Sequence, residues 1–242
     1  MWGRLLLAGC AVGALVCSFA NPSFAARTPA TDTSYEENYS YAAHGALFGS
    51  REVYSQSTWR FAQWTDMLSR TAAEYKASTH VCASRGDTNC TPAEWQSLID
   101  SLKGLDLRQQ IKRVNDAMNN HPYVTTAQNW HRAMYWESPF EFLRYGGQCQ
   151  DYAIAKYELL RAAGVSADLM RMVVLRDAAI GVDHAVLAVY VDGQPMLLDN
   201  LRRDIVPASA VSYYRPYYSI NETGWWTHFG GQAMTQVAAN YR

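Results

Sequence analysis

Apolar residues recur at helical spacing over residues 57–77 and again over residues 107–118, so both segments are predicted to be helices. Between them, Thr91 followed by Pro92 is typical of a helix start, because threonine caps free backbone N–H groups and proline fits the first helical position. The pair His121-Pro122 ends the helical run. The first half of the folded chain is therefore predicted to be helical.

Two more helices are predicted after residue 137, and strands follow them. Ser138-Pro139 repeats the start signal for a short helix, which Gly146-Gly147 closes, and a longer helix is predicted from Cys149 to Ala163. Runs rich in valine, leucine and alanine then predict strands at Leu169–Leu175, Asp183–Val191 and Pro195–Asp199. We therefore expect an α+β fold, in which a helical N-terminal half packs on a small antiparallel sheet and Cys149 begins the central helix.

Aromatic residues make up 13% of the chain and crowd its C-terminal part. We interpret this aromatic cluster as core and rim packing, with the wall of a substrate groove as the alternative. The cluster consists of Tyr213, Tyr214, Tyr217, Tyr218, Trp225 and Trp226.

Residues 1–25 have the features of a secretory signal peptide: a basic start, an apolar stretch and small residues before a cleavage site at Ala25. An uncleaved membrane anchor is the alternative interpretation. Residues 26–56 are polar and weakly periodic, and we predict an N-terminal arm there, followed by one domain over residues 57–242. No other run of about 20 apolar residues occurs, so no integral membrane span is expected after processing.

The charge balance excludes some partners. The 242 residues hold 21 Lys and Arg against 22 Asp and Glu, a net charge of −1. Nucleic acids and anionic membrane surfaces need a clustered basic excess, so neither is expected as the main partner. No glycine-rich phosphate loop follows a strand, and the other histidines lack metal-ligand spacing, so we expect neither a nucleotide enzyme nor a histidine metal site.

Export would place the mature chain in an oxidising compartment. Removal of the signal peptide leaves three cysteines, of which Cys82 and Cys90 bracket a polar turn and are predicted to form a disulfide. Cys149 is then the odd thiol, either buried and inert or retained for chemistry.

The surroundings of Cys149 favour chemistry. The N–H groups and partial positive charge at a helix start lower the pKa of a thiol and can later bind an oxyanion. His184 begins the second predicted strand, Asp199 ends the third, and the Asp192-Gly193 turn brings both to the same end of a hairpin. These residues are predicted to be nucleophile, general base and orienting acid, although a Cys, a His and an Asp in this order also occur by chance.

At these residues the chain resembles the bacterial transglutaminase-like cysteine peptidases, whose LapG-like members are periplasmic proteases. The resemblance is carried by residues 136–143, by Gly146-Gly147-Gln148-Cys149-Gln150-Asp151-Tyr152, and by residues 183–187 and 198–200. It implies a papain-like, transglutaminase-like core with Cys149, His184 and Asp199 as the catalytic triad. It also implies an inner-membrane regulator as a partner.

One departure concerns calcium. LapG-like members carry acidic residues on both sides of the catalytic cysteine, which help to bind calcium, whereas this chain has Gln148 and Gln150. Calcium prefers several hard oxygens with carboxylate charge, and Asp151 is the one weak candidate ligand that remains. We therefore expect no cofactor and assign the chain to a divergent branch of the family.

The function predicted from the sequence is that of a periplasmic cysteine endopeptidase that cleaves an exported or cell-surface protein through a thioester acyl-enzyme. Gln148 and Trp136 are expected to bind substrate or the oxyanion. A transglutaminase or protein deamidase that acts on glutamine side chains shares the first chemical step and remains an alternative. A non-catalytic periplasmic binding module is the alternative outside enzymes.

Overall fold

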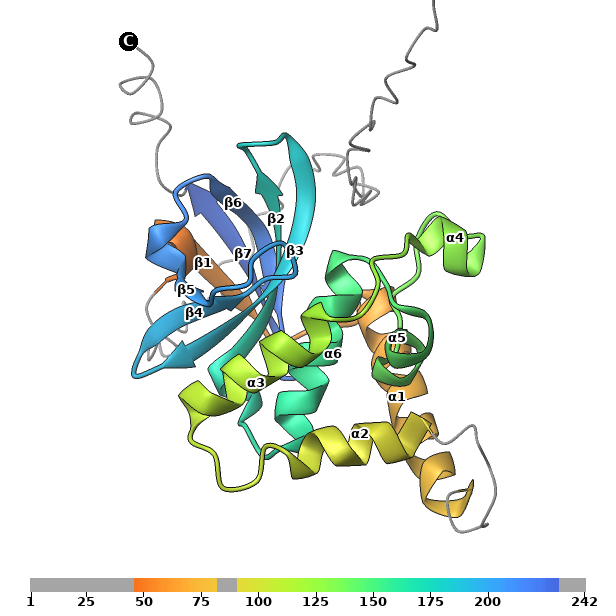
Figure 1. Ribbon diagram of the computed structural model, residues 1–242. Coiled ribbons are helices and arrows are strands. Elements are labelled where there is room, and N and C mark those ends of the chain that lie inside the picture. Colours follow the sequence, from red (N-terminus) through yellow and green to blue (C-terminus); the bar gives the residue numbers. More distant parts are fainter. Residues whose placement is uncertain (1–45, 82–90, 231–242) are drawn as a thin grey trace, which may run out of the picture.

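The computed structural model describes residues 46–81 and 91–230 (Figure 1). Six α-helices of this part lie on one side of a twisted antiparallel sheet, and α6 lies between the sheet and the other helices. The helices are α1 (Ala62–Val81), α2 (Thr91–Asp100), α3 (Leu107–Asn119), α4 (Thr126–Trp130), α5 (Pro139–Tyr145) and α6 (Cys149–Ala162).

Side-chain caps fix several helix starts. The Asp106 carboxylate accepts a hydrogen bond from the backbone N–H of Gln109 at the start of α3. Ser138 does the same for Glu141 at the start of α5, and the Glu141 carboxylate accepts from the Ser138 N–H in return. Each such pair supplies acceptors for backbone donors that the helix itself leaves unsatisfied.

Seven strands of the described residues form one antiparallel sheet in the order β1-β7-β6-β2-β3-β4-β5. They are β1 (Ser50–Ser55), β2 (Met170–Asp177), β3 (Val182–Val191), β4 (Gln194–Leu198), β5 (Val206–Pro207), β6 (Tyr214–Ile220) and β7 (Trp225–Gly230). Short 3₁₀ turns lie at Leu47–Gly49, Ala167–Leu169 and Ala208–Ala210.

The central strands are buried on both faces, because each face has its own apolar cluster. In β3, Leu187, Val189 and Val191 pack with the helices, whereas the alternate residues Val186 and Ala188 pack in a second cluster on the other face. Alternation with period two explains the division, and burial on both faces explains why β2 and β3 are nearly continuous apolar runs. The helix α6 is therefore held between the sheet and α2, α3 and α5.

The predicted α+β class is confirmed, but the sheet is larger than three strands. Of the C-terminal aromatic residues, those at positions 214, 217 and 218 lie in β6 and those at 225 and 226 lie in β7, whereas Tyr213 directly precedes β6. Residues 50–55, which were predicted to belong to an N-terminal arm, form the edge strand β1. Turn signals in the sequence predict the pairing of strands within a hairpin, whereas β1 pairs with β7, whose residues lie 170 or more positions further along the chain. The signal peptide assigned to residues 1–25 lies outside the described residues.

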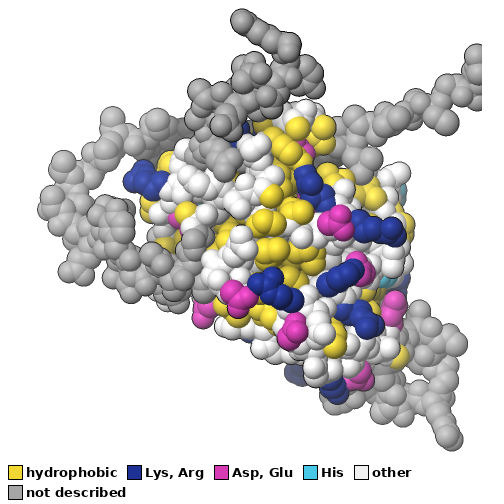
Figure 2. All heavy atoms as spheres, turned by 60° about the vertical axis from the view of Figure 1, so that its left-hand side comes forward, with side chains coloured by type: hydrophobic (Ala, Val, Ile, Leu, Met, Phe, Trp, Pro, Cys, Tyr) yellow, Lys and Arg dark blue, Asp and Glu magenta, His cyan; other side chains and the backbone are white. Residues whose placement is uncertain are grey.

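The surface carries charges of both signs, as the net charge of −1 implies. On the face shown in Figure 2, acidic and basic side chains are interspersed around a band of apolar side chains. Among the described residues, no helix combines the length and the apolar character that crossing a membrane requires.

Candidate active site

Cys149 is the first residue of α6 and is almost completely buried, with 1% of its surface exposed. Two glycines make the turn that precedes it. Gly146 ends α5 with φ of +70°, and a Cβ there would lie 2.2 Å from the carbonyl oxygen of Pro122, so no larger residue fits. Cys149 thus lies at a helix N-terminus, as predicted, where the first N–H groups have no acceptor within the helix.

The segment after α3 forms one wall of this turn. The N–H of Gly147 donates to the Pro122 carbonyl (3.3 Å), and the N–H of Val124 donates to the Gly147 carbonyl (3.1 Å). This pairing sets Tyr123 against Cys149, and both pack on Ala185, the residue next to His184. The pair His121-Pro122 was predicted as a helix stop, but the position of Tyr123 was not predicted, because the chain carries no local signal for it.

His184 and Asp199 form a buried pair, with 2.9 Å between His184 Nε2 and Asp199 Oδ1. The register of the β3–β4 hairpin pairs Leu187 with Leu198, so its continuation sets Asp199 opposite Val186. His184 is then the diagonal neighbour on the same face, which is within reach of a hydrogen bond. The predicted juxtaposition of the two residues at one end of the hairpin is confirmed.

The Asp199 carboxylate has further donors. Leu201 donates its backbone N–H to Oδ1 (2.9 Å), Tyr214 donates its hydroxyl to Oδ2 (2.7 Å), and Arg202 Nε lies 3.7 Å from Oδ2. Burial raises the pKa of Asp199, but the hydrogen bond and charge of His184 and the bonds from Tyr214 and Leu201 outweigh it and hold the pKa below its usual value. Asp199 is thus kept ionised.

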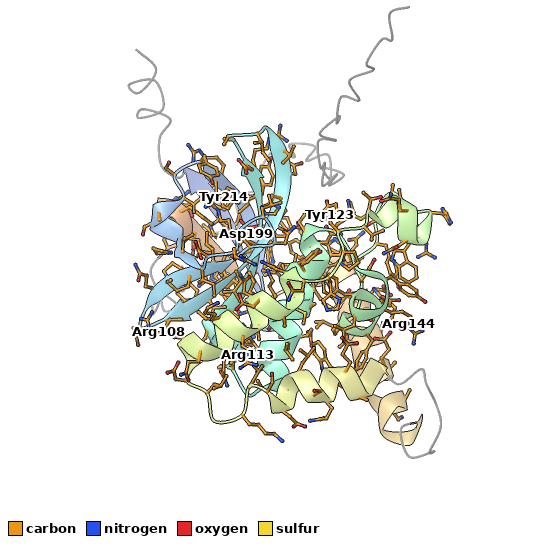
Figure 3. The ribbon with its side chains drawn as sticks, viewed as in Figure 1. Arg108, Arg113, Tyr123, Arg144, Asp199 and Tyr214 are labelled. Atoms are coloured by element: carbon orange, nitrogen blue, oxygen red, sulfur yellow. The ribbon has the colours of Figure 1, made fainter. Side chains whose placement is uncertain are left out.

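The sequence predicted Tyr214 as part of core and rim packing, with the wall of a substrate groove as the alternative. Its ring contributes to the apolar cluster on the outer face of the sheet and lies 5.9 Å from the His184 ring, and its hydroxyl reaches Asp199. Burial and the neighbouring Asp199 charge raise the pKa of Tyr214, so the phenol stays a donor. Figure 3 shows Tyr214 and Asp199 together on the sheet, with Tyr123 across from them near the start of α6.

Asp151 is a buried acceptor of several hydrogen bonds beside the Gly146-Gly147 turn that precedes Cys149. Its Oδ1 accepts from the Glu137 N–H (2.9 Å), and its Oδ2 accepts from the Gln148 N–H (2.8 Å) and from Gln150 Nε2 (3.0 Å). A Cβ on Gly147 would lie 2.8 Å from Oδ2, so glycine is required for this approach. Asp151 therefore ties the turn before Cys149 to the segment before α5.

Asp151 and Glu137 are two buried carboxyl groups that influence each other. Burial and the Glu137 charge raise the pKa of Asp151, and burial, against hydrogen bonds from Asn129 and Trp130, raises that of Glu137. Glu137 Oε1 accepts from Asn129 Nδ2 (3.0 Å) and Trp130 Nε1 (2.6 Å), whereas its buried Oε2 has no hydrogen-bond partner among the described residues.

The remaining predicted site residues occupy different environments. Gln148 precedes α6, and its Oε1 accepts from Thr126 Oγ1 (2.6 Å). The side chain of Trp136, by contrast, is 5% exposed and belongs to the core under the helices.

The predicted disulfide partners Cys82 and Cys90 lie outside the described residues. Within residues 46–81 and 91–230, no group of three or more His, Cys, Asp or Glu side chains is arranged to hold a metal ion.

Comparison with known proteins gives one matching family and several similar solved structures. Residues 69–234 match the family described as bacterial transglutaminase-like cysteine proteinase. The EGTA-treated structure of Legionella pneumophila LapG is 34% identical over 63% of this chain and 84% of that chain, with a TM-score of 0.54. The calcium-bound structure of Legionella pneumophila LapG is 32% identical over 69% of this chain and 96% of that chain, with the same TM-score of 0.54.

Among the curated proteins, none gives a match. The matched segment nevertheless covers more than half of the chain and contains the Gly146-Gly147 turn, α6 and the β3–β4 hairpin. The chain belongs to the bacterial transglutaminase-like cysteine proteinases.

Proposed function

We propose that the chain is a periplasmic cysteine endopeptidase that cleaves an exported or cell-surface protein with Cys149, His184 and Asp199 as its triad. The observation that supports this most strongly is the buried His184–Asp199 hydrogen bond (2.9 Å) on the strand whose Ala185 packs against Cys149. Export is supported by the sequence of residues 1–25 and by family membership, whereas an inner-membrane regulator as a partner is supported by family membership alone.

The hydrogen bond to Asp199 determines which imidazole nitrogen of His184 can react with the thiol. Because Nε2 of His184 is bound by Asp199, Nδ1 is the nitrogen that exchanges protons with the thiol. Cys149 gives its S–H proton to Nδ1, and the thiolate forms an S–C bond to the scissile carbonyl carbon. The tetrahedral intermediate collapses, the C–N bond breaks, and the imidazolium proton goes to the leaving amine.

Hydrolysis of the thioester follows the same route in reverse. His184 takes a proton from water, the hydroxide adds to the acyl carbon, and the C–S bond breaks as the second intermediate collapses. The departing thiolate regains its proton from His184. Asp199 keeps the imidazole in one orientation throughout and stabilises the imidazolium.

The oxyanion would be stabilised at the start of α6. The first-turn N–H groups of a helix have no acceptor within the helix, and the Cys149 N–H belongs to this group. Gln148 uses its backbone N–H on Asp151 and its Oε1 on Thr126, and its side chain also forms a hydrogen bond with the Tyr123 phenol. Its amide Nε2 would therefore exchange that partner for the oxyanion if Gln148 donates to it. Trp136 is assigned to support of the core rather than to substrate binding.

The residues around the nucleophile do not fit a calcium ion. Gln148 and Gln150 carry no charge, and each oxygen of Asp151 already accepts at least one hydrogen bond. Gln150 directs an amide nitrogen, a donor, at Asp151 Oδ2, where a cation would need an oxygen ligand. We therefore propose that activity does not require calcium, although one structure of Legionella pneumophila LapG is calcium-bound.

The test compares cell-surface proteins of the source bacterium with those of strains that carry Cys149→Ala or His184→Ala. Terminal fragments should appear by mass spectrometry in the wild type and disappear in both variants, and the purified chain should reproduce the cleavage. Glutamine deamidation or cross-linking without backbone cleavage would instead support a deamidase or transglutaminase. Identical fragments in all strains would contradict the proposed function.

A further inference from the structure

The face of the sheet that contacts Cys149 continues past the active site along the β2–β3 hairpin. In β3, Leu187 packs with the helices, and Ala185 packs on Cys149. Because side chains alternate along a strand, Asp183 lies on this same face, two residues or about 7 Å beyond Ala185. The β2–β3 hairpin extends beyond the helical layer at this end of the sheet (Figure 1).

Two arginines lie opposite each other on this part of the face. Arg176 of β2 pairs with Asp183 of β3 on one side and with Arg215 of β6 on the other. Directly opposed residues of antiparallel strands share a face, with Cβ atoms about 5 Å apart, and like charges in these positions are unfavourable. The three side chains thus form a row across three strands, with two positive charges and one negative charge.

The one carboxylate of this row is bound by only one of the two arginines. Asp183 Oδ1 accepts a hydrogen bond from Arg176 Nη1 at 3.0 Å, and the Arg176 side chain is 43% exposed. Arg215 Nη1 donates to the carbonyl oxygens of Ser212 (2.6 Å) and Tyr214 (3.1 Å), and no carboxylate of the described residues forms an ion pair with it. Each guanidinium group has five N–H donors, so the row keeps a net positive charge and donors for a further acceptor.

A tyrosine lies beside this row. Tyr217 is the extra residue of a β-bulge in β6, because the register between β2 and β6 shifts between Val174 and Leu175. A bulge can redirect a side chain, and the Tyr217 hydroxyl donates to Asp183 Oδ1 at 2.9 Å. The residue is 42% exposed, and Ile180 in the β2–β3 turn is 60% exposed. Exposed aromatic and apolar surface beside arginine is typical of a surface that binds a peptide or protein.

On the basis of the peptidase function above, we propose that Arg176, Arg215 and Tyr217 form a substrate subsite that binds an acidic side chain about two residues from the scissile bond. An extended peptide rises about 3.4 Å per residue, so the distance of about 7 Å from Ala185 to Asp183 corresponds to two residues. The substrate carboxylate supplies the anion that Arg215 lacks and accepts hydrogen bonds from Arg176. Tyr217 packs against the peptide.

The subsite can be tested without turnover by the rate at which peptide probes alkylate Cys149 in reduced protein. Peptide chloromethyl ketones would carry Glu or Gln two residues before the reactive carbon, and chloroacetyl peptides would carry the same pair two residues after it. In one of the two series, the Glu probe should react with the wild type about tenfold faster than the Gln probe, the order of one hydrogen bond to a charged group. The ratio should fall to about one in Arg176→Gln, and it should also fall in Arg215→Gln.

Charge reversal sharpens this test, because Arg176→Glu should react faster with a Lys probe than with the Glu probe. A ratio of about one in both series for the wild type would overturn the proposal, and so would an unchanged ratio in Arg176→Gln. Absence of alkylation by every probe would overturn it as well, because a peptide that reaches the subsite must also reach Cys149.

The matched control is Arg108→Gln. Arg108 is also an exposed arginine that pairs with one carboxylate, that of Asp192 (2.6 Å), which follows the far end of β3. Figure 3 shows Arg108 far from Tyr123, which packs beside Cys149. The control should keep the preference for the Glu probe. Exposed ion pairs stabilise a protein little, so all these variants should fold, which circular dichroism would verify.

Cleavage of a peptide library separates the subsite from the peptidase function. The purified wild type would digest peptides derived from a bacterial proteome, and mass spectrometry would identify the cleaved bonds. Asp and Glu should be enriched about two residues from these bonds on one side, and the enrichment should disappear in Arg176→Gln. Cleavage without acidic enrichment would refute the subsite alone. Absence of cleavage by the wild type would contradict the peptidase function, and the alkylation ratios would still decide the subsite.

Discussion

Tyr214 donates its hydroxyl to Asp199 Oδ2 at 2.7 Å, so the carboxylate that holds His184 is itself held by a residue of β6. The strand β6 pairs with β2, and β2 pairs with the His184 strand β3. The orientation of the imidazole therefore depends on three neighbouring strands, and a change at Tyr214 should affect catalysis without contact with substrate.

Replacement of Tyr214 by Phe should lower kcat about tenfold, equivalent to ~1.4 kcal/mol in the barrier, and leave KM nearly unchanged. The variant loses one hydrogen bond to a charged acceptor and keeps the ring in its apolar cluster. Steady-state kinetics with a cleaved peptide would measure both constants. Tyr213→Phe is the matched control, and an equal loss of kcat in both variants would show that the effect is not specific to the Asp199 bond.

Local signals explain how much of this site could be predicted. The Gly146-Gly147 turn marks the start of α6, and the two-residue turn at Asp192-Gly193 sets the β3–β4 register. Each of these signals acts over a few residues, so the placement of Cys149 at a helix start and of His184 beside Asp199 follows from short-range geometry.

The sequence did not predict the roles of several residues near the site, because their positions depend on long-range packing. Tyr214 reaches Asp199 only because β6 joins the sheet beside β2, and its aromatic surroundings have no strand periodicity. Asp151 was predicted as a weak candidate calcium ligand, whereas its hydrogen bonds from Glu137 and Gln148 depend on a turn brought back against α6.

Replacement of His184 by alanine and replacement of Asp199 by alanine should lower turnover to different extents. His184→Ala removes the group that transfers protons and should lower kcat by about three orders of magnitude or more. Asp199→Ala removes the group that orients the His184 imidazole and stabilises its positive charge, so it should lower kcat by a smaller factor. Single-turnover kinetics would compare them, with Asp116→Ala on α3 as a control acid, and circular dichroism would verify folding. A folded His184→Ala variant with near-normal turnover would contradict the triad.

Glu137→Gln should stabilise the protein, and more strongly at pH 8 than at pH 4.5. The folded state raises the pKa of both Glu137 and Asp151, so it holds more protons than the unfolded chain above pH 4.5. Linkage then makes the free energy of unfolding fall as the pH rises through this range. Glutamine keeps an acceptor for Asn129 and Trp130 and removes one buried charge.

The gain at pH 8 should be roughly 1 kcal/mol, the order of one pKa unit. Chemical denaturation at the two pH values would measure it, with the exposed Glu94→Gln as a control that changes stability equally at both. A Glu137→Gln gain that is larger at pH 4.5 would reverse the sign of the coupling and contradict the assignment of two repelling carboxyl groups.

Calcium should change neither activity nor stability of the wild type. A calcium site with a Kd of about 1 µM would add ~4 kcal/mol to the free energy of unfolding at 1 mM calcium, a rise of several degrees in melting temperature. The Gln150 amide instead donates to Asp151 Oδ2, and two neutral side chains flank Cys149. Melting curves and cleavage assays in EGTA and in 1 mM calcium should therefore coincide.

The positive control is the double variant Gln148→Asp with Gln150→Glu. It places two carboxylates beside Asp151 and should acquire a calcium-dependent rise in melting temperature. A rise in the wild type that disappears in Asp151→Ala would mean that Asp151 and neutral oxygens suffice to bind the ion, and that the hydrogen bond from Gln150 gives way to it.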